Sequence, residues 1–227
     1  MLDTIEEKSE LSHKTDKTIF NLLVDIYFEV KRKWYQLRYS NLTIAKGVKV
    51  KGPLKISGKV RVKIDSDTRI RKRLKIFGSG EVTIGKNVSL NGCLIGCQSS
   101  VSIGDDCLIS DCYLVDTDYH NLEPHLRHAP PGPKVTAAIV IERNVWIGAK
   151  ATVMKGVRIG KNSAIGLGSV VRKSVPANVV VIGNPQQIVK SLLPKDKSSG
   201  KNDRNIQEKR PVTHSADTEK LNWTQTK

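Results

Sequence analysis

Aromatic residues are scarce in this chain: Phe, Trp and Tyr make up 5% of its 227 residues, although 38% of the residues are hydrophobic. A core so poor in rings must be filled mainly by Ile, Val, Ala and Ser, which suits a thin interior one side-chain layer deep. Rings are also missing from the most basic stretch, residues 46–75, where Phe77 is the nearest. Because single-stranded nucleic acids bind by stacking bases on aromatic side chains, we expect no nucleic-acid partner.

The cysteines lack the paired spacing of a structural zinc site, and no segment reads as a signal peptide for an oxidising compartment. There are four of them, Cys93, Cys97, Cys107 and Cys112. We therefore expect reduced thiols buried in the core of a cytoplasmic protein.

Long apolar runs are absent too, and residues 17–40 illustrate the consequence. Asp25, Glu29 and the cluster at 31–33 interrupt any run near the roughly 20 residues needed to cross a bilayer. Apolar residues instead recur at intervals of three and four, which predicts a helix. They are Ile19, Phe20, Leu23, Ile26, Tyr27, Val30, Trp34 and Leu37. We expect this stripe to pack on the adjoining domain or on a neighbouring subunit, with a shallow anchor at a membrane surface as the alternative.

Over residues 141–171 an aliphatic residue recurs at every sixth position, and a small or β-branched residue stands four positions after it. The first set is Ile141, Ile147, Val153, Ile159, Ile165 and Val171, and the second is Val145, Ala151, Val157, Ser163 and Ser169. Neither a helix nor a strand of period two has this spacing. It is typical of a hexapeptide-repeat β-helix, in which three hexads form one coil of about eighteen residues and the aliphatic side chains stack in a column.

The repeats divide the chain into three parts. Residues 1–43 are the N-terminal helical segment, residues 44–190 the all-β domain, and residues 191–227 a basic tail that we expect to be disordered. The period blurs through residues 69–80, and it fails at about residues 119–138, where three histidines and four prolines gather. Insertions in a solenoid form loops that often carry function, so the second interruption is the predicted active-site loop.

His120 stands where a hexad strand gives way to this loop, two and four residues after Asp118 and Asp116. A histidine can take a proton from a hydroxyl nucleophile, and a carboxylate can hold its tautomer. If the stretch stays extended, all three side chains point to one side. We therefore predict His120 as a general base with Asp116 or Asp118 as its partner.

Four sequence segments are informative when they are taken together in their order along the chain. They are Asp-Thr-Asp-Tyr-His at 116–120, Asn-Val-Trp-Ile-Gly-Ala at 144–149, Ala-Ile-Gly-Leu-Gly-Ser-Val-Val at 164–171 and Gly-Asn-Pro at 183–185. Over residues 44–190 the chain resembles the left-handed β-helix acyltransferases, and most of all the sugar O-acetyltransferases of the maltose, galactoside and capsule or colanic acid type. The resemblance implies a left-handed parallel β-helix, a homotrimer with active sites between neighbouring β-helices, and direct acetyl transfer from acetyl-CoA to a sugar hydroxyl without a metal.

The resemblance also assigns roles to individual residues. His120 matches the catalytic base, and Trp146 matches a tryptophan beside the acetyl-pantetheine arm. Backbone amides around Gly148 and Ala149 match the oxyanion and pantetheine contacts. The remaining cofactor-binding positions are Gly166, Leu167, Gly168 and Ser169 along the pantetheine and adenine, and Arg172, Lys173 and Lys190 near the phosphates. The regular coils would then form the wall of the acetyl-CoA groove, to which the irregular loop delivers His120.

Two departures from the family pattern concern the acceptor. Asn121 stands where the family often has proline after its histidine, and the acceptor-binding residues of the small-sugar members have no counterpart upstream of Ile44. The acceptor therefore stays open among a sugar hydroxyl, an amino sugar and the hydroxyl of serine, with the order of motifs favouring the sugar hydroxyl.

Two other functions compete with acetyl transfer. His120 and His125 have the spacing of zinc ligands in β-helical carbonic anhydrases, but the third histidine that such a site needs has no candidate in a preceding coil. The alternative without catalysis is a scaffold that uses residues 46–75, where twelve Lys or Arg stand against Asp65 and Asp67. Such a field attracts an anionic polysaccharide or a membrane surface, although a merely solvated face is equally consistent with it.

Overall fold

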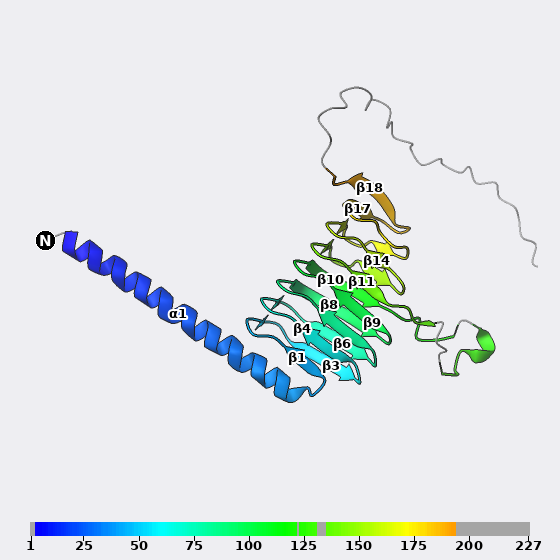
Figure 1. The fold of residues 1–227 in the computed structure, drawn as a ribbon, viewed down its shortest axis with the longest axis horizontal. Helices are drawn as coiled ribbons and strands as arrows, with labels where there is room; N and C mark the ends of the chain where they lie inside the picture. The colour runs from blue at the N-terminus through cyan, green and yellow to red at the C-terminus, as the bar shows by residue number, and fades with distance from the viewer. Residues whose placement is uncertain (1–2, 122, 131–134, 194–227) are drawn as a thin grey trace, which may run out of the picture. The chain divides into compact units, whose positions relative to one another are not determined.

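The computed structural model describes residues 3–121, 123–130 and 135–193, with side chains from Phe20 onward. Helix α1 (Asp3–Arg38) is followed by a parallel β-helix with three faces (Figure 1). The predicted hexapeptide-repeat β-helix is thus confirmed. The tail predicted to be disordered lies outside the described residues from position 194 on.

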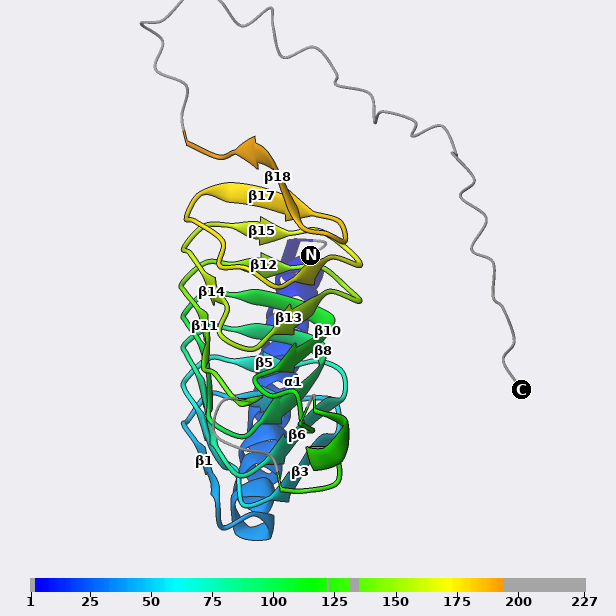
Figure 2. The same cartoon turned by 90° about the vertical axis from the view of Figure 1, so that its right-hand side faces the viewer.

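Each face is a stack of short parallel strands. Face A contains β1 (Leu42–Ile44), β4 (Arg61–Ile64), β7 (Glu81–Ile84), β9 (Ser100–Ile103), β11 (Ile139–Ile141) and β14 (Arg158–Ile159). Face B contains β2 (Lys49–Val50), β5 (Arg69–Ile70), the first parts of β8 (Ser89–Cys97) and β10 (Leu108–Val115), then β12 (Trp146–Ile147), β15 (Ala164–Ile165) and β17 (Val179–Ile182). Face C contains β3 (Leu54–Gly58), β6 (Leu74–Gly78), the second parts of β8 and β10, then β13 (Thr152–Met154) and β16 (Val170–Val171). Strand β18 (Gln187–Ser191) pairs antiparallel with β17. Coils 1 to 6 begin with the face A strands in chain order, and Figure 2 shows them stacked.

The inward residues form the predicted aliphatic columns. On face A the column consists of Ile44, Ile64, Ile84, Ile103, Ile141 and Ile159, each no more than 3% exposed. Burying such a side chain stabilises the fold by about 1.5–3 kcal/mol. The outward neighbours in the strands are polar or exposed, as alternation requires.

The coil length changes along the stack, which explains where the hexad pattern blurs. Stacked partners are 18 residues apart in the upper coils, as for Ile141 and Ile159. They are 20 apart at Ile44 and Ile64 and 19 apart at Ile84 and Ile103. The lower coils have longer strands on faces C and A, and the added residues lie at the corner between them. The predicted active-site loop is inserted at this same corner, after β10 and before β11.

Polar residues in the left-handed conformation hold the corner between faces A and B. Asn144, Asn162 and Asn178 have φ of 55° to 61° and stand one coil apart. Asn144 Nδ2 donates to Asn162 Oδ1 at 3.0 Å, and Asn162 Nδ2 donates to Asn178 Oδ1 at 2.9 Å. This asparagine ladder lets non-glycine residues turn the corner, because asparagine tolerates the left-handed region.

All four cysteines are buried and free, as predicted. Burial raises the pKa of the Cys97 thiol to about 12 and that of Cys107 to about 11. The Sγ atoms of Cys93 and Cys112 lie 3.4 Å apart, and this hydrogen bond together with burial raises the pKa of Cys93 well above its usual range. These thiols serve as small core side chains.

Helix α1 begins well before the predicted start at residue 17, and it uses a different face for packing than the one predicted. Buried Arg32 donates to the Ile44 carbonyl at 3.1 Å, and the Tyr35 hydroxyl accepts from the Leu54 amide at 3.2 Å. Lys49 pairs with Asp25 at 2.8 Å. This polar and aromatic face contacts coil 1.

The expectation that the apolar stripe packs on the adjoining domain is therefore wrong. Its members with described side chains are 51–88% exposed: Phe20, Leu23, Ile26, Tyr27, Val30, Trp34 and Leu37. That a neighbouring subunit or a membrane surface covers the apolar stripe stays a prediction. Within the described ranges, no helix has the length and apolar character needed to span a bilayer.

Candidate active site

The predicted active-site loop leaves face C at the end of β10 and returns at β11. An antiparallel bridge between Thr117 and Thr136 closes its base, where the Asp118 amide donates to the Val135 carbonyl at 3.0 Å. The described part of the loop includes a 3-10 helix, Pro124–Leu126. Residues 122 and 131–134 lie outside the described residues. His120 follows the loop base directly and is exposed.

The structure gives Asp116 a role other than the predicted one. Its side chain is fully buried, and its two carboxylate oxygens accept from the amides of Gln98 and Ser99, both at 2.7 Å. These bonds hold the corner of the preceding coil. Both oxygens are thus committed to the backbone, and Asp116 does not orient His120.

Asp118 is likewise engaged elsewhere, because it forms an ion pair with Lys155 at the end of β13. The predicted alternation fails after β10, since Tyr119 turns the chain with φ of 63°. Within the described residues neither carboxylate hydrogen-bonds to the imidazole of His120.

Tyr119 anchors the loop and was missed by the sequence analysis. Its ring stacks on Phe77 of β6, with centroids 5.9 Å apart and planes 9° apart. It covers Gly96, where an added Cβ would lie 2.0 Å from the Tyr119 hydroxyl oxygen. Burial, aided by the charge of Asp116, raises the pKa of the Tyr119 phenol. The signal in the sequence was Gly96, the residue that leaves room for the ring.

The predicted cofactor residues of coils 5 and 6 gather at the corner between faces B and C. Ala149 and Leu167 occupy equivalent positions on the two coils, and the Gly168 amide donates to the Ala149 carbonyl at 2.9 Å. Leu167 is 77% exposed. A Cβ on Gly148 would lie 2.8 Å from the Leu167 amide nitrogen, so the close stacking here requires glycine.

The amides at this corner divide into used and available donors. The Gly148 amide donates to the Ile165 carbonyl at 2.8 Å, and the Gly166 amide to the Val181 carbonyl at 2.8 Å. Gly148 is therefore no oxyanion donor. The amides of Ala149 and Leu167 donate to no acceptor within the described part of the chain. Two preorganised N–H groups are thus left one coil apart on this corner.

Trp146 lies beside this corner on face B and is 57% exposed. It stands in one row with Leu108 and Ala164, and the row continues through Val180 to Lys190 of β18. An apolar strip that ends at a cation suits a ligand with an apolar arm and an anionic end. Trp146 and Lys190 thus lie in one row of face B, and their cofactor-binding roles stay predictions.

Three further predicted residues fall elsewhere. The Ser169 side chain is fully buried and its Oγ accepts from the Gly183 amide at 3.1 Å, so only its backbone is open to a ligand. Arg172 and Lys173 lie at the next corner, between faces C and A. Both of their amides donate to Gln186 Oε1, at 2.6 and 2.8 Å. Gln186, which the sequence analysis missed, braces this corner.

His120 and the predicted cofactor corner, the corner between faces B and C, lie at opposite edges of face C within one chain. The loop follows the ends of the face C strands, whereas Gly148 and Ala149 precede the start of β13. Within one chain the loop therefore does not bring His120 to this corner, and the predicted site between neighbouring β-helices would have to join the loop of one chain to the corner of another.

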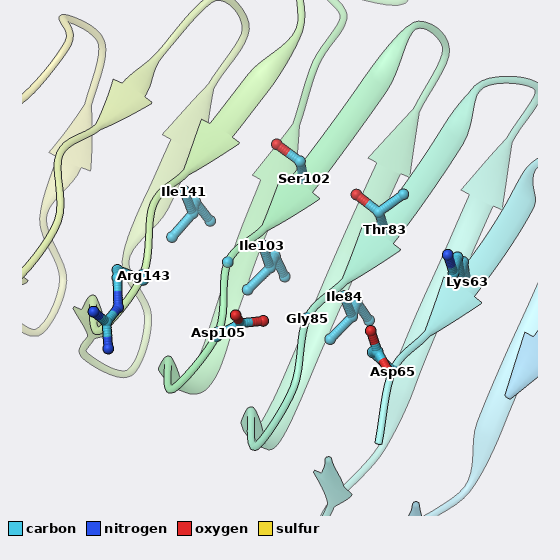
Figure 3. A pocket seen from close by; sticks show the side chains of 11 residues that line it. Lys63, Asp65, Thr83, Ile84, Gly85, Ser102, Ile103, Asp105, Ile141 and Arg143 are labelled. Carbon is cyan, nitrogen blue, oxygen red and sulfur yellow. The ribbon is translucent and has the colours of Figure 1, made fainter. Parts of the chain in front are cut away.

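A separate hollow lies on face A, lined by residues from coils 2 to 5. Figure 3 shows Ile84, Ile103 and Ile141 pointing to the interior behind it. Asp105 Oδ1 accepts from the Lys86 amide at 2.7 Å, so this carboxylate holds the backbone. None of the predicted site residues lines this hollow. Among the residues the structure describes, no group of three or more His, Cys, Asp or Glu is placed to hold a metal ion.

Comparisons with known proteins agree with the β-helical fold. Residues 138–173 match the bacterial transferase hexapeptide family (six repeats). The chain is 36% identical over 121 residues to a galactoside O-acetyltransferase of Lactococcus lactis, covering 53% of this chain and 58% of the relative. It is 35% identical over 126 residues to the putative lipopolysaccharide biosynthesis O-acetyl transferase WbbJ of Escherichia coli, covering 52% and 64%. The matched segment thus spans less than two thirds of these curated relatives.

Two solved structures share the fold. The polySia specific acetyltransferase NeuO superposes with a TM-score of 0.57 at 27% identity, covering 70% of each chain. A variant of AntD, an N-acyltransferase from Bacillus cereus, superposes with a TM-score of 0.58 at 20% identity, covering 71% of this chain and 90% of that one. The hexad columns, the motif order and these likenesses agree: residues 138–173 match the bacterial transferase hexapeptide family, and the β-helix of this chain is similar to those of the O-acetyltransferases named above and of NeuO.

Proposed function

We propose that this protein is an O-acetyltransferase that moves an acetyl group from acetyl-CoA to a sugar hydroxyl at a site built by two subunits of a homotrimer. One observation carries the proposal: the corner of coils 5 and 6 offers two unused backbone donors beside exposed Trp146, while His120 lies on a loop at the opposite edge of the same face. The O-acetyltransferases among its relatives support the reaction class.

In the proposed reaction, His120 of one subunit takes the proton of the acceptor hydroxyl as its oxygen attacks the thioester carbonyl. The carbonyl oxygen gains negative charge, and the Ala149 amide of a neighbouring subunit stabilises it without reorganisation, because that donor is fixed by the coil. Collapse of the intermediate breaks the carbon–sulfur bond. The coenzyme A thiolate then receives the proton held by His120, and no acyl-enzyme forms.

A site between subunits follows from the position of the groups. A three-fold arrangement of parallel β-helices places the loop edge of one chain against the cofactor corner of the next, by a heterologous interface that closes. The exposed Trp146 and Leu167 would be covered there. Because acetyl-CoA is an intracellular metabolite, the proposal includes a cytoplasmic location.

The proposal is tested by thiol release from acetyl-CoA with a panel of neutral sugars, anionic sugars, amino sugars and serine. We expect turnover with a sugar hydroxyl and a loss of about 10²–10⁴-fold in His120→Ala. His125→Ala, in the same loop, is the matched control and should keep its rate. Sedimentation must give the same trimer for all three proteins. Full turnover in His120→Ala would overturn the mechanism, and turnover only with amino sugars would move the protein to N-acetyl transfer.

A further inference from the structure

We propose that face C of coils 1 and 2 binds the anionic part of the acceptor, so that the acceptor is an oligosaccharide or polysaccharide bearing carboxylate or phosphate groups. This inference rests on the proposed function and names its substrate class. It concerns a row of cations that the reaction itself does not use.

The row begins with two lysines stacked in register. Lys55 of β3 and Lys75 of β6 are paired neighbours on face C, at the strand spacing of about 4.8 Å. Like charges directly opposite each other destabilise a sheet. Within the described ranges neither lysine forms an ion pair. An anion lying across both would relieve the repulsion.

A pocket beside this row adds two cations and a ring. It is lined by Lys72, Arg73 and Lys75, and by Tyr113, which is 43% exposed. Asp111 also lines the pocket, but its carboxylate is paired with Lys150 at 2.6 Å. The positive charge of the pocket is therefore left largely unbalanced. Cations next to an exposed aromatic ring suit a charged sugar, whose ring packs on the tyrosine while its acid group meets the lysines.

Above the two lysines the row continues with uncharged residues, and the neighbouring row leads to the predicted active-site loop. In register, Lys75 is followed by Leu94 and then Tyr113 along face C. In the neighbouring row, the Phe77 ring lies 5.5 Å from Lys75 Nζ and stacks on Tyr119, the residue before His120. Figure 2 shows the loop, with its short helical turn, on the side of the β-helix where β6 and β3 lie.

The length of this path determines the size of the acceptor. From Lys55 in coil 1 to Tyr113 in coil 4 there are three strand spacings, or about 14 Å. A single sugar ring cannot span the row from Lys55 to Tyr113. An acceptor that uses the whole path must have several sugar units, with its acidic groups over coils 1 and 2 and its reacting hydroxyl near His120.

Binding is the first test, and it does not depend on catalysis. The intact protein is titrated with polygalacturonate, dextran sulfate and neutral dextran at 50 mM and 300 mM salt. We expect binding of the two polyanions, weakened by salt, and none of neutral dextran. The double variant Lys55→Gln/Lys75→Gln should bind them about tenfold more weakly or worse. Lys86→Gln/Lys161→Gln, which removes the same charge from the A–B corner, should change the affinity less than twofold. Equal weakening by both variants, or no binding of either polyanion at 50 mM salt, would overturn the inference.

Kinetics separate this inference from the proposed function. With an acidic acceptor, Lys55→Gln/Lys75→Gln should raise the acceptor KM and leave kcat and the acetyl-CoA KM unchanged. A raised acetyl-CoA KM would show that these cations hold the donor phosphates instead. Full activity on neutral sugars without polyanion binding would overturn the acceptor class and leave acetyl transfer standing. Polyanion binding without acetyl transfer to any acceptor would overturn the proposed function, on which the inference rests.

The same cations must be tested against a lipid surface. Vesicles of phosphatidylcholine with 30% phosphatidylglycerol are sedimented with the wild type and with Lys55→Gln/Lys75→Gln. We expect no difference between the two proteins. Vesicle binding that the substitutions abolish, together with unchanged polyanion binding, would assign face C to a membrane and overturn the inference.

Discussion

Tyr119 stacks on Phe77 with ring centroids 5.9 Å apart, so the loop that carries His120 is held to face C two coils below its origin. The contact exists because Gly96 lies between them and has no side chain. If His120 is the general base, as proposed, it must reach a bound hydroxyl, and the position of the Tyr119 ring determines where it lies.

Gly96→Ala should therefore damage catalysis more than stability. The new Cβ collides with the Tyr119 hydroxyl, the far end of a side chain, so the ring moves and the loop with it. A displacement of about 1 Å costs about 10²-fold in rate, and we expect a loss of that order in kcat. Chemical denaturation should show a change of unfolding free energy of only about 1 kcal/mol.

Tyr119→Phe is the matched control for this experiment. The Tyr119 hydroxyl is buried without a hydrogen-bond partner in the described structure. Removing it keeps the stacked ring and should raise the unfolding free energy by about 1 kcal/mol. Equal loss of activity in Tyr119→Phe and Gly96→Ala would mean that the hydroxyl, rather than the anchor, serves the reaction.

Asn162 combines a strained backbone with two side-chain hydrogen bonds in the asparagine ladder. Asn162→Gly keeps the left-handed φ and loses only the bonds, so we expect a loss of about 1 kcal/mol in unfolding free energy. Asn162→Ala keeps a Cβ but also loses the local hydrogen bonding by which asparagine tolerates the left-handed conformation, for a total of about 2–3 kcal/mol. Thermal and urea unfolding of the two variants measure the difference. Equal losses would show that the corner does not need the left-handed conformation.

The buried thiols should make the fold sensitive to alkali. The pKa of Cys107 is raised by burial from 9.0 to about 11, so above pH 9 the unfolded chain loses this proton while the folded chain keeps it. Stability is therefore full below pH 9 and falls between pH 9 and 11. At pH 10 the loss is about 1 kcal/mol for this thiol. Cys107→Ala should show a shallower decline of unfolding free energy from pH 8 to 10 than the wild type. Parallel curves would contradict the assignment.

The aliphatic columns could be predicted because their cause is local. Period six and inward orientation follow from the shape of each short strand, and all six predicted residues from Ile141 to Val171 are buried. The hexad pattern becomes irregular at residues 69–80 for an equally local reason, because the lower coils are longer. A strict six-residue spacing therefore no longer matches the inward positions there. Buried Ile70, Leu74 and Ile76 continue the columns without a break.

The roles of individual polar residues were harder to predict, because they depend on contacts between coils. Asp116 is close to His120 in the sequence, which led to the prediction of a catalytic role. In the structure both of its carboxylate oxygens accept hydrogen bonds from the amides of Gln98 and Ser99. Ser169 has the sequence spacing of a core position, and its side chain is buried. The resemblance had assigned its segment to cofactor binding, which its side chain cannot serve. Spacing along the chain cannot show which group one coil away needs a partner.

The separation of His120 from the cofactor corner leads to the sharpest test of the assembly. His120→Ala lacks the base but keeps the corner, whereas Ala149→Trp fills the corner but keeps the base. Each variant should be inactive alone. Mixed in equal amounts by coexpression, they form trimers in which an intact loop meets an intact corner at about a quarter of the interfaces, given heterologous three-fold contacts. We therefore expect about a quarter of the wild-type rate in thiol release from acetyl-CoA. A double variant carrying both changes, coexpressed with wild type, controls for expression and mixing. If one chain supplied both groups, coexpression of the two single variants would restore nothing, and the site between subunits would be refuted.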